Sequence, residues 1–339
     1  MEVWEEPVRG GYPPLWMMAL SGQQRNDLWE KYAPIPPLGH LTGCRPTEFG
    51  FGESRSVMPA SPWLQSPQGR IPLGALAVLA DLAFGTCYGS TLPPGGGFTT
   101  AELSLTRVQE TWPGGVLVGH GRVVHAGQSS VLTEARLYDP EGHLVAAGMS
   151  RLAVFPPPPE LPAVPDPLPE TERPTYDTPD PWQRDSPGGV LDEADWAGRS
   201  GMEILEAQVA RELPPPPISR LTGLRVRVVG EGRAVVELPA SPWLSTPAGT
   251  VQGGFTALIA DTALACAIQT TLRRGDTFVP LDVKVNYLRP VMPDGRLLTA
   301  TAKVTHEGRS LAVAHATVHN ADGKPVALAT GSAALTAAR

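Results

Sequence analysis

Two aspartates stand in the middle of long apolar stretches, where a charged side chain is unexpected. Asp261 follows the pair Gly253-Gly254, and Asp81 occupies the middle of a similar run. Glycines that open a helix leave backbone N–H groups unobstructed at the positive end of the helix dipole, where they can stabilise an anion. A carboxylate inside an apolar helix is poorly solvated, so its pKa is expected to rise. Together these groups could attack a carbonyl, with the carboxylate as general base or nucleophile and the N–H groups binding the oxyanion.

The chain contains an internal duplication, which relates these two aspartates to each other. The hexapeptide Pro59-Ala-Ser-Pro-Trp-Leu64 recurs 180 residues later as Pro239-Ala-Ser-Pro-Trp-Leu244, and the same spacing relates Asp81 to Asp261. A period of this length is that of a whole domain and not of a solenoid repeat. The recurrence favours a functional role for the aspartates over the structural alternative, in which each merely caps a neighbouring loop.

The duplication predicts two domains joined by a linker. We expect the first domain over residues 20–155 and the second over residues 199–339. The intervening residues 156–198 are rich in proline, which cannot donate to a β-ladder, so they are expected to form an extended, semi-rigid spacer.

Each domain has the same predicted elements. A short helix and a proline break precede one strand (45–58 and 224–238), a long apolar helix (73–88 and 253–270) and four further strands. A helix that is apolar on nearly every face requires burial on all sides. The prediction is therefore an α+β fold, in which two tandem domains each wrap an antiparallel curved sheet of about five strands around a long helix.

Composition narrows the class of function. The 339 residues carry a net charge of −7 without a lysine or arginine cluster, which argues against nucleic acid as a partner. The two apolar stretches each contain an aspartate and are short for a membrane span, so no membrane partner is expected. The three cysteines are scattered and no metal-ligand spacing occurs, so we expect a cytoplasmic protein without metal or cofactor.

The sequence resembles the hotdog-fold acyl-CoA thioesterases of the phenylacetate-pathway (PaaI-like) type. The motif that carries the resemblance is Gly249-Thr-Val-Gln-Gly-Gly-Phe-Thr-Ala-Leu-Ile-Ala-Asp261, supported by Val285-Asn-Tyr-Leu-Arg-Pro290. The resemblance covers residues 201–337 well and the first copy more weakly. It implies that paired hotdogs form active sites at their interface, that the substrate is an acyl-CoA or acyl-carrier thioester, and that two such chains could form a homodimer.

The resemblance also implies roles for individual residues. Asp81 and Asp261 take the catalytic carboxylate position, and Gly253 or Leu73 supplies the oxyanion amide to the aspartate of the other copy. The residues implied to contact the substrate are Gly254, Leu73, Gly74, Thr246, and the arginines Arg289 and Arg309 near the CoA phosphates.

Two departures distinguish the copies. The histidine-glycine-glycine motif of the family reads Gln252-Gly-Gly in the second copy and Pro72-Leu-Gly in the first. Glutamine can donate a hydrogen bond to a carbonyl and proline cannot, so we expect the Gly253/Asp81 site to be the more competent one. The alternatives to hydrolysis are acyl-CoA binding without turnover and, ranked last, another hotdog reaction such as hydration of an enoyl thioester.

Overall fold

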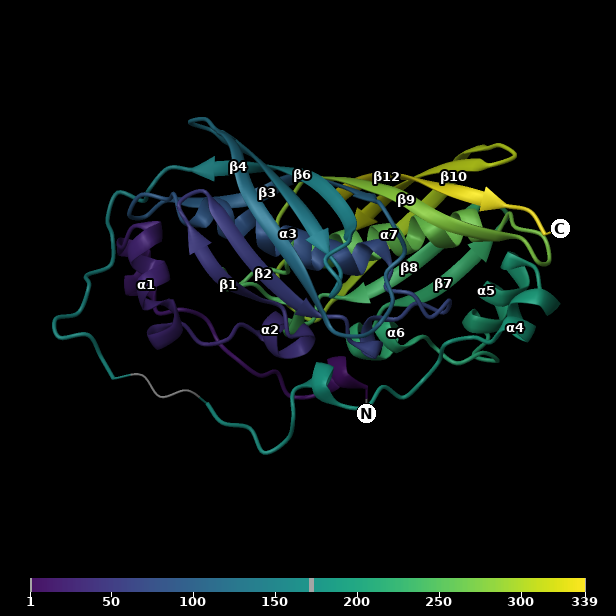
Figure 1. Cartoon of the computed structure of the whole chain (residues 1–339), viewed down its shortest axis with the longest axis horizontal. Coiled ribbons are helices and arrows are strands. Elements are labelled where there is room, and N and C mark those ends of the chain that lie inside the picture. Colours follow the sequence, from purple (N-terminus) through teal and green to yellow (C-terminus); the bar gives the residue numbers. More distant parts are fainter. Residues whose placement is uncertain (1, 171–173, 339) are drawn as a thin grey trace.

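The computed structural model describes residues 2–170 and 174–338, and it shows one continuous sheet wrapped around two long helices (Figure 1). The helices are α3 (Leu73–Gly89) and α7 (Gly253–Gln269), one from each copy of the repeat. Both are apolar around their whole circumference, so the sheet covers them on one side and they cover each other. The α+β double-hotdog fold predicted from the sequence is confirmed.

Each copy contributes six strands to the sheet and not the expected five. Residues 45–58 and 224–238 each form a two-stranded hairpin, because a glycine with positive φ turns the chain, Gly52 in the first copy and Gly232 in the second. The strands of the first copy are β1 (Arg45–Gly50), β2 (Glu53–Pro59), β3 (Gly97–Arg107), β4 (Val116–Ala126), β5 (Ser130–Tyr138) and β6 (Leu144–Phe155). Those of the second are β7 (Arg225–Gly230), β8 (Arg233–Pro239), β9 (Thr277–Tyr287), β10 (Leu297–Glu307), β11 (Leu311–His319) and β12 (Pro325–Thr336).

The two copies join edge to edge through an antiparallel pair of equivalent strands. The order is β1-β2-β4-β5-β6-β3-β9-β12-β11-β10-β8-β7, so β3 and β9 lie side by side at the centre. Ser104 of β3 pairs with Lys284 of β9, and these two residues are equivalent in the duplication. A local two-fold axis therefore passes between them, and it relates the two long helices as well.

Glycines allow the two long helices to touch backbone to backbone. A Cβ atom at Gly74 would lie 2.6 Å from the Cα of Leu258, and one at Gly254 would lie 2.5 Å from the Cα of Val78. The start of each helix therefore rests against the middle of the other, where that helix carries its aspartate. This close approach positions the candidate site.

The remaining helices lie around the rim of the sheet. They are η1 (Val3–Glu5), η2 (Leu15–Ala19), α1 (Gly22–Tyr32), α2 (Pro37–Thr42), η3 (Pro62–Leu64), η4 (Pro181–Gln183), α4 (Glu193–Gly198), α5 (Gly201–Val209), α6 (Pro217–Thr222) and η5 (Pro242–Leu244). The proline-rich segment is thus not extended throughout, because η4 and α4 interrupt it. Among the described residues, the search for a helix of sufficient length and hydropathy to span a membrane finds none.

The segments that precede the two copies are exchanged between them. Trp4 in η1 lies over Gly223 of the second copy, and Glu6 accepts a hydrogen bond from the indole of Trp243. Trp182 in η4 lies over Gly43 of the first copy in the same way, while the indole of Trp63 donates to the carbonyl of Arg184. We call η1 and η4, with the residues that follow them to Glu6 and Arg184, the two covers. An ion pair of 2.7 Å between Arg184 and Glu6 joins them, and they lie together at the edge of the molecule (Figure 1).

Candidate active site

The aspartates predicted from the sequence each lie against the N-terminus of the opposite copy's long helix. Asp81 is buried beside the start of α7, where the N–H of Gly254 donates to its Oδ2 atom over 3.3 Å. The hydroxyl of Thr100 donates to the other oxygen, Oδ1, over 2.9 Å. Both oxygens of Asp81 therefore have donors from the protein.

Asp261 has the equivalent position at the start of α3, but only one of its oxygens is bonded. The N–H of Gly74 donates to Oδ2 over 2.8 Å. Pro280 occupies the position equivalent to Thr100 and has no hydroxyl to offer. Oδ1 of Asp261 consequently has no hydrogen-bond donor within the described parts of the chain, and it can accept a proton from a water molecule or contact a substrate.

Burial raises the pKa of both carboxyl groups to about 6. For Asp81 the hydrogen bonds from Thr100 and from the start of α7 oppose the rise, and for Asp261 the Gly74 amide and then the positive charge of Arg107 do so. A carboxyl group with a pKa near 6 is mostly ionised at neutral pH and is still a far stronger base than an exposed aspartate. This is the range in which a general base works efficiently.

The amides of Gly254 and Gly74 donate to the two carboxylates, and the amide of Gly253 also lies against Asp81. The oxyanion role expected for Gly253 and Leu73 stays a prediction. Gly253 and Leu73 are the first residues of their helices, so their N–H groups have no acceptor within the helix. The Leu73 N–H has no acceptor elsewhere in the described residues either. Leu73 itself is fully buried, and it is the preceding residues Ile71 and Pro72 that line the cavity described below.

The residues that precede the two helices differ as the sequence indicates. The side-chain amide of Gln252 is buried and donates to the carbonyl of Val78 over 3.0 Å, so it holds the start of α7 against α3. Its Oε1 atom is covered and has no partner among the residues that the structure describes. Pro72 at the equivalent place has no such group. Tyr287 adds a second contact at the start of α7, since its hydroxyl donates to the carbonyl of Gly253 over 2.8 Å.

A cavity of about 160 Å³ opens at Asp261. Its walls come from both copies: the loop before α3, the C-terminal half of α7, and segments of α5, α6, β7 and β9. The apolar part of the wall includes Leu205, Ile218, Ala265, Cys266 and Phe278. A volume of this order holds a molecule about the size of benzene, so the cavity can accommodate a short acyl group beside the carboxylate.

Arg107, at the end of β3, is a second charged group in this cavity that the sequence analysis did not identify. It is equivalent to Tyr287 of the other site. Its Nε atom donates to the carbonyl of Pro280 over 2.9 Å, whereas its Nη1 atom is covered and unpartnered. Burial lowers the pKa of Arg107, and the nearby carboxylate of Asp261 opposes that shift. The signal in the sequence was that the repeat has arginine in one copy and tyrosine in the other.

Other residues implied by the resemblance lie away from these aspartates. Thr246 stabilises its own turn, where its hydroxyl accepts a hydrogen bond from the N–H of Ala248. Arg289 is exposed and donates to the carbonyl of Pro325, and Arg309 is exposed at a hairpin. None of the three lines the cavity at Asp261, and their predicted contacts with substrate remain predictions.

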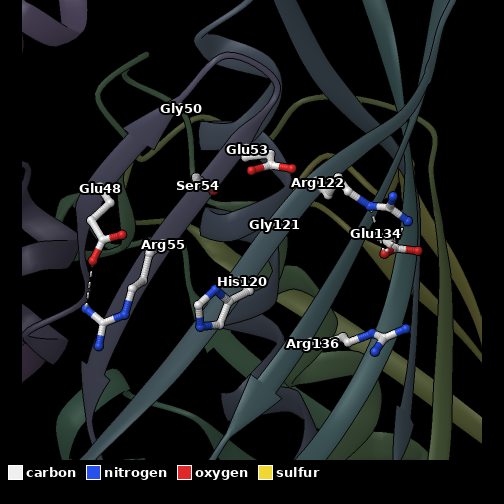
Figure 2. A pocket seen from close by; sticks show the side chains of 10 residues that line it. All are labelled: Glu48, Gly50, Glu53, Ser54, Arg55, His120, Gly121, Arg122, Glu134 and Arg136. Carbon is white, nitrogen blue, oxygen red and sulfur yellow. Dashed lines mark hydrogen bonds and ion pairs between the residues drawn. The ribbon is translucent and has the colours of Figure 1, made fainter.

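A second hollow lies on the outer face of the sheet, over β1, β2, β4 and β5 (Figure 2). Figure 2 shows two ion pairs there, Arg55 with Glu48 and Arg122 with Glu134, beside the further charged side chains of Glu53 and Arg136. The side chains are largely exposed, and the long helices lie on the opposite face of the sheet. This hollow therefore has no part in the arrangement around the aspartates.

Comparisons with known proteins agree with the fold and the duplication. The profile of the thioesterase superfamily matches residues 72–146 and again residues 248–327, which are the segments that contain the two long helices. A tesB protein of Mycobacterium avium subspecies paratuberculosis shares the fold over 89% of this chain and 98% of its own, with a TM-score of 0.56 and 14% identity.

Two curated proteins match part of the sequence. One, named "Putative esterase", is from Haemophilus influenzae and is 32% identical over 91 residues, which are 27% of this chain and 64% of that protein. The other is a 1,4-dihydroxy-2-naphthoyl-CoA hydrolase of Listeria monocytogenes, 28% identical over 91 residues, 27% of this chain and 72% of that protein. Each copy of the repeat is therefore similar to the thioesterase superfamily over the segment that contains its long helix.

Proposed function

We propose that the chain hydrolyses short-chain acyl thioesters of CoA or of an acyl carrier, at the composite site between Asp261 and the start of α3. The observation that carries the proposal is the geometry of Asp261. One of its oxygens is held by the Gly74 amide, and the other is free beside a cavity of acyl size. Esterase and CoA-ester hydrolase are also the activities named for the two curated relatives.

The reaction follows from the groups that surround the cavity. Asp261 takes a proton from water, and the resulting hydroxide attacks the thioester carbon. The carbonyl oxygen becomes negative and is stabilised by the Leu73 N–H and the positive end of α3. The tetrahedral intermediate then collapses, the carbon–sulfur bond breaks, and the sulfur leaves as a thiol with the proton that Asp261 had taken, so that the carboxylate is restored as the carboxylic acid product forms. In the nucleophilic alternative, Asp261 itself attacks the carbon and water hydrolyses the mixed anhydride.

This proposal places the chemistry at the other aspartate from the one that the sequence favours. The sequence favours Asp81 because glutamine and glycine are retained at the start of α7. The geometry favours Asp261, since both oxygens of Asp81 already accept hydrogen bonds from Thr100 and Gly254. In this proposal, Asp81 and its donors chiefly position the second helix.

The test is hydrolysis of a panel of acyl-CoA and acyl-carrier thioesters of increasing chain length. Asp261→Asn is expected to lower kcat by about 10²- to 10⁴-fold, the contribution of a general base, while Asp81→Asn has a smaller effect. Wild-type rates in Asp261→Asn would exclude this site, and a loss confined to Asp81→Asn would assign the reaction to the other one. Tight binding of thioesters by the wild type without turnover would identify a binding protein, the alternative that Pro72 and Leu73 favour.

A further inference from the structure

Two donors that line the Asp261 cavity have no acceptor. The Nη1 atom of Arg107 and the Nε2 atom of Gln208 are both covered, and neither has a partner within the described ranges. Both groups can only donate. A buried donor without an acceptor is costly, and a buried cation without an anion is more so. Both side chains belong to the cavity wall and keep a donor that no described residue uses, so a small rotation of either side chain would present that donor to an acceptor oxygen of a ligand.

Arg107 differs in this respect from the other two arginines of the cavity wall. Arg70 forms an ion pair with Glu110, and Arg225 forms one with Glu237 over 2.7 Å. Arg107 forms no ion pair among the described residues, even though Asp261 is near enough to influence its pKa. Arg107 is thus the arginine of this cavity wall that has a carboxylate nearby but, among the described residues, no carboxylate in direct contact.

The equivalent position of the other site shows that this is not a general property of the fold. There, Tyr287 directs its hydroxyl to the backbone carbonyl of Gly253, so the position is uncharged and its polar atom is satisfied. The difference between Arg107 and Tyr287 distinguishes the two composite sites, which share a fold and a carboxylate. The difference therefore changes the charge that the two composite sites present, as well as the contact that Tyr287 makes with the start of α7.

We propose that the Asp261 site selects acyl groups that carry a carboxylate of their own, and that Arg107 binds this carboxylate. The proposal rests on the proposed function, and it names the substrate class of that same site. A guanidinium and a carboxylate form a strong charge-assisted hydrogen bond, and Gln208 offers a further donor in the same cavity. The size of the cavity suits the acyl group of the monothioester of a short dicarboxylic acid. Arg107 is then a specificity-determining residue.

The same acceptor chemistry could come from the CoA part of the substrate, through its phosphates or its amide carbonyls. A matched pair of substrates separates the two sources. Succinyl-CoA and butyryl-CoA share the CoA and a four-carbon acyl chain, and they differ in a terminal carboxylate against a methyl group. If Arg107 binds the acyl carboxylate, its substitution lowers kcat/KM for succinyl-CoA alone. If Arg107 binds the CoA part, its substitution lowers kcat/KM for both esters equally.

The experiment measures kcat/KM for both esters with the wild type, Arg107→Met, Arg107→Lys and Arg225→Met. The wild type is expected to prefer succinyl-CoA. Arg107→Met should lose about 10- to 100-fold on succinyl-CoA, the value of a hydrogen bond to a charged group, and change little on butyryl-CoA. Arg107→Lys should restore part of the preference. Arg225→Met, a matched change at a paired arginine, should keep the wild-type ratio of the two esters.

Equal losses on both esters would overturn the proposal, as would a wild type without preference for succinyl-CoA. A second measurement is independent of hydrolysis: free succinate should raise the Tm of the wild type more than butyrate does, and Arg107→Met should abolish this difference. If succinate passes this test and no ester is hydrolysed, the hydrolase proposal fails and the assignment of Arg107 stands. If esters are hydrolysed but neither test shows a preference for the carboxylate, the assignment of Arg107 fails and the hydrolase stands.

Discussion

The backbone amide of Gly74 and the carboxylate of Asp261 are 187 residues apart in the chain and 2.8 Å apart in space. Because one belongs to each copy of the repeat, neither copy alone contains this arrangement. The pairing of Gly254 with Asp81 repeats it about the local two-fold axis. Each long helix thus supplies a carboxylate to one site and a dipole to the other.

Replacement of either buried aspartate by asparagine should stabilise the folded chain at neutral and alkaline pH. The pKa of Asp261 rises from 3.8 to about 6 on folding, so the folded state binds this proton more tightly than the unfolded state. Ionisation therefore destabilises the fold: the effect is absent below about pH 4, grows as the pH rises through 6, and is complete above that. A shift of two units corresponds to about 3 kcal/mol, an upper value for the gain in Asp261→Asn.

Thermal unfolding at pH 8 and at pH 3.5 checks this prediction. Tm should rise in Asp261→Asn and Asp81→Asn at pH 8 and stay unchanged at pH 3.5. Asp294→Asn is the opposite control, since a hydrogen bond from Arg296 lowers the pKa of Asp294, and its Tm should fall at pH 8. A lower Tm of Asp261→Asn at pH 8 would show that the ionised carboxylate holds the helices together.

The pH dependence of hydrolysis should report the ionisation of Asp261. A general base acts in its deprotonated form, so kcat/KM should fall as the pH decreases through about 6 and be level above it. Pro280→Thr would place a hydroxyl where Asp81 has Thr100. A new hydrogen bond to Oδ1 should lower the pKa of Asp261, move the acidic limb to lower pH and reduce kcat. If the acidic limb of the pH profile does not move in Pro280→Thr, a group other than Asp261 controls the rate. Thr100→Val is the reciprocal control at the Asp81 site, and its pH profile should match that of the wild type.

Alanine at the glycines between the helices should separate them. In Gly74→Ala the new Cβ would meet the backbone of Leu258, and in Gly254→Ala that of Val78. Overpacking of this kind costs about 1–3 kcal/mol, and it should also lengthen the contact between amide and carboxylate. Denaturant unfolding and kcat measure the two effects. Gly89→Ala at the end of α3, where a Cβ would meet nothing within 4 Å, is the matched control and should leave both unchanged.

Removal of the indole of Trp4 should destabilise the second copy of the repeat, although Trp4 precedes the first copy in the sequence. Trp4→Ala is expected to lower the free energy of unfolding by about 2 kcal/mol, less than at a fully buried tryptophan. Hydrogen exchange should rise in α6 and around Trp243, and not in α2. Trp112→Ala, at a side chain that is 56% exposed, should change neither. Faster exchange in the first copy after Trp4→Ala would contradict the exchanged arrangement.

Much of the fold follows from local sequence. The apolar helices, the repeat and the position of each aspartate within its helix could be predicted because they depend on patterns within one segment. The division of residues 45–58 into two strands was not predicted, since the turn is only two residues long and depends on the positive φ of Gly52. The pairing of aspartates with the opposite helix came from the resemblance, because no pattern within one copy indicates its partner.

The candidate site was only partly accessible from sequence. Arg107 reaches the cavity because the register of β3 against β9 carries it to the side of Asp261, and residues 154 positions apart show no local relation. The Oδ1 atom of Asp261 is free because Pro280, unlike Thr100 of the other copy, has no hydroxyl to donate. Pro280 and Asp261 show no local relation in the sequence either. The exchanged covers were missed because Trp4 and Trp182 lie in short segments without helical or strand periodicity.

The exchanged covers have a consequence for any attempt to divide the protein. A cut in the proline-rich stretch before η4 would leave a first fragment that carries η1, which covers the second copy, and a second fragment that carries η4, which covers the first copy. Neither fragment could cover its own hydrophobic core, since each would carry the cover that belongs to the other. The two should therefore recover a native structure only when mixed in equal amounts, which makes the halves obligate partners and not modules that can be expressed alone.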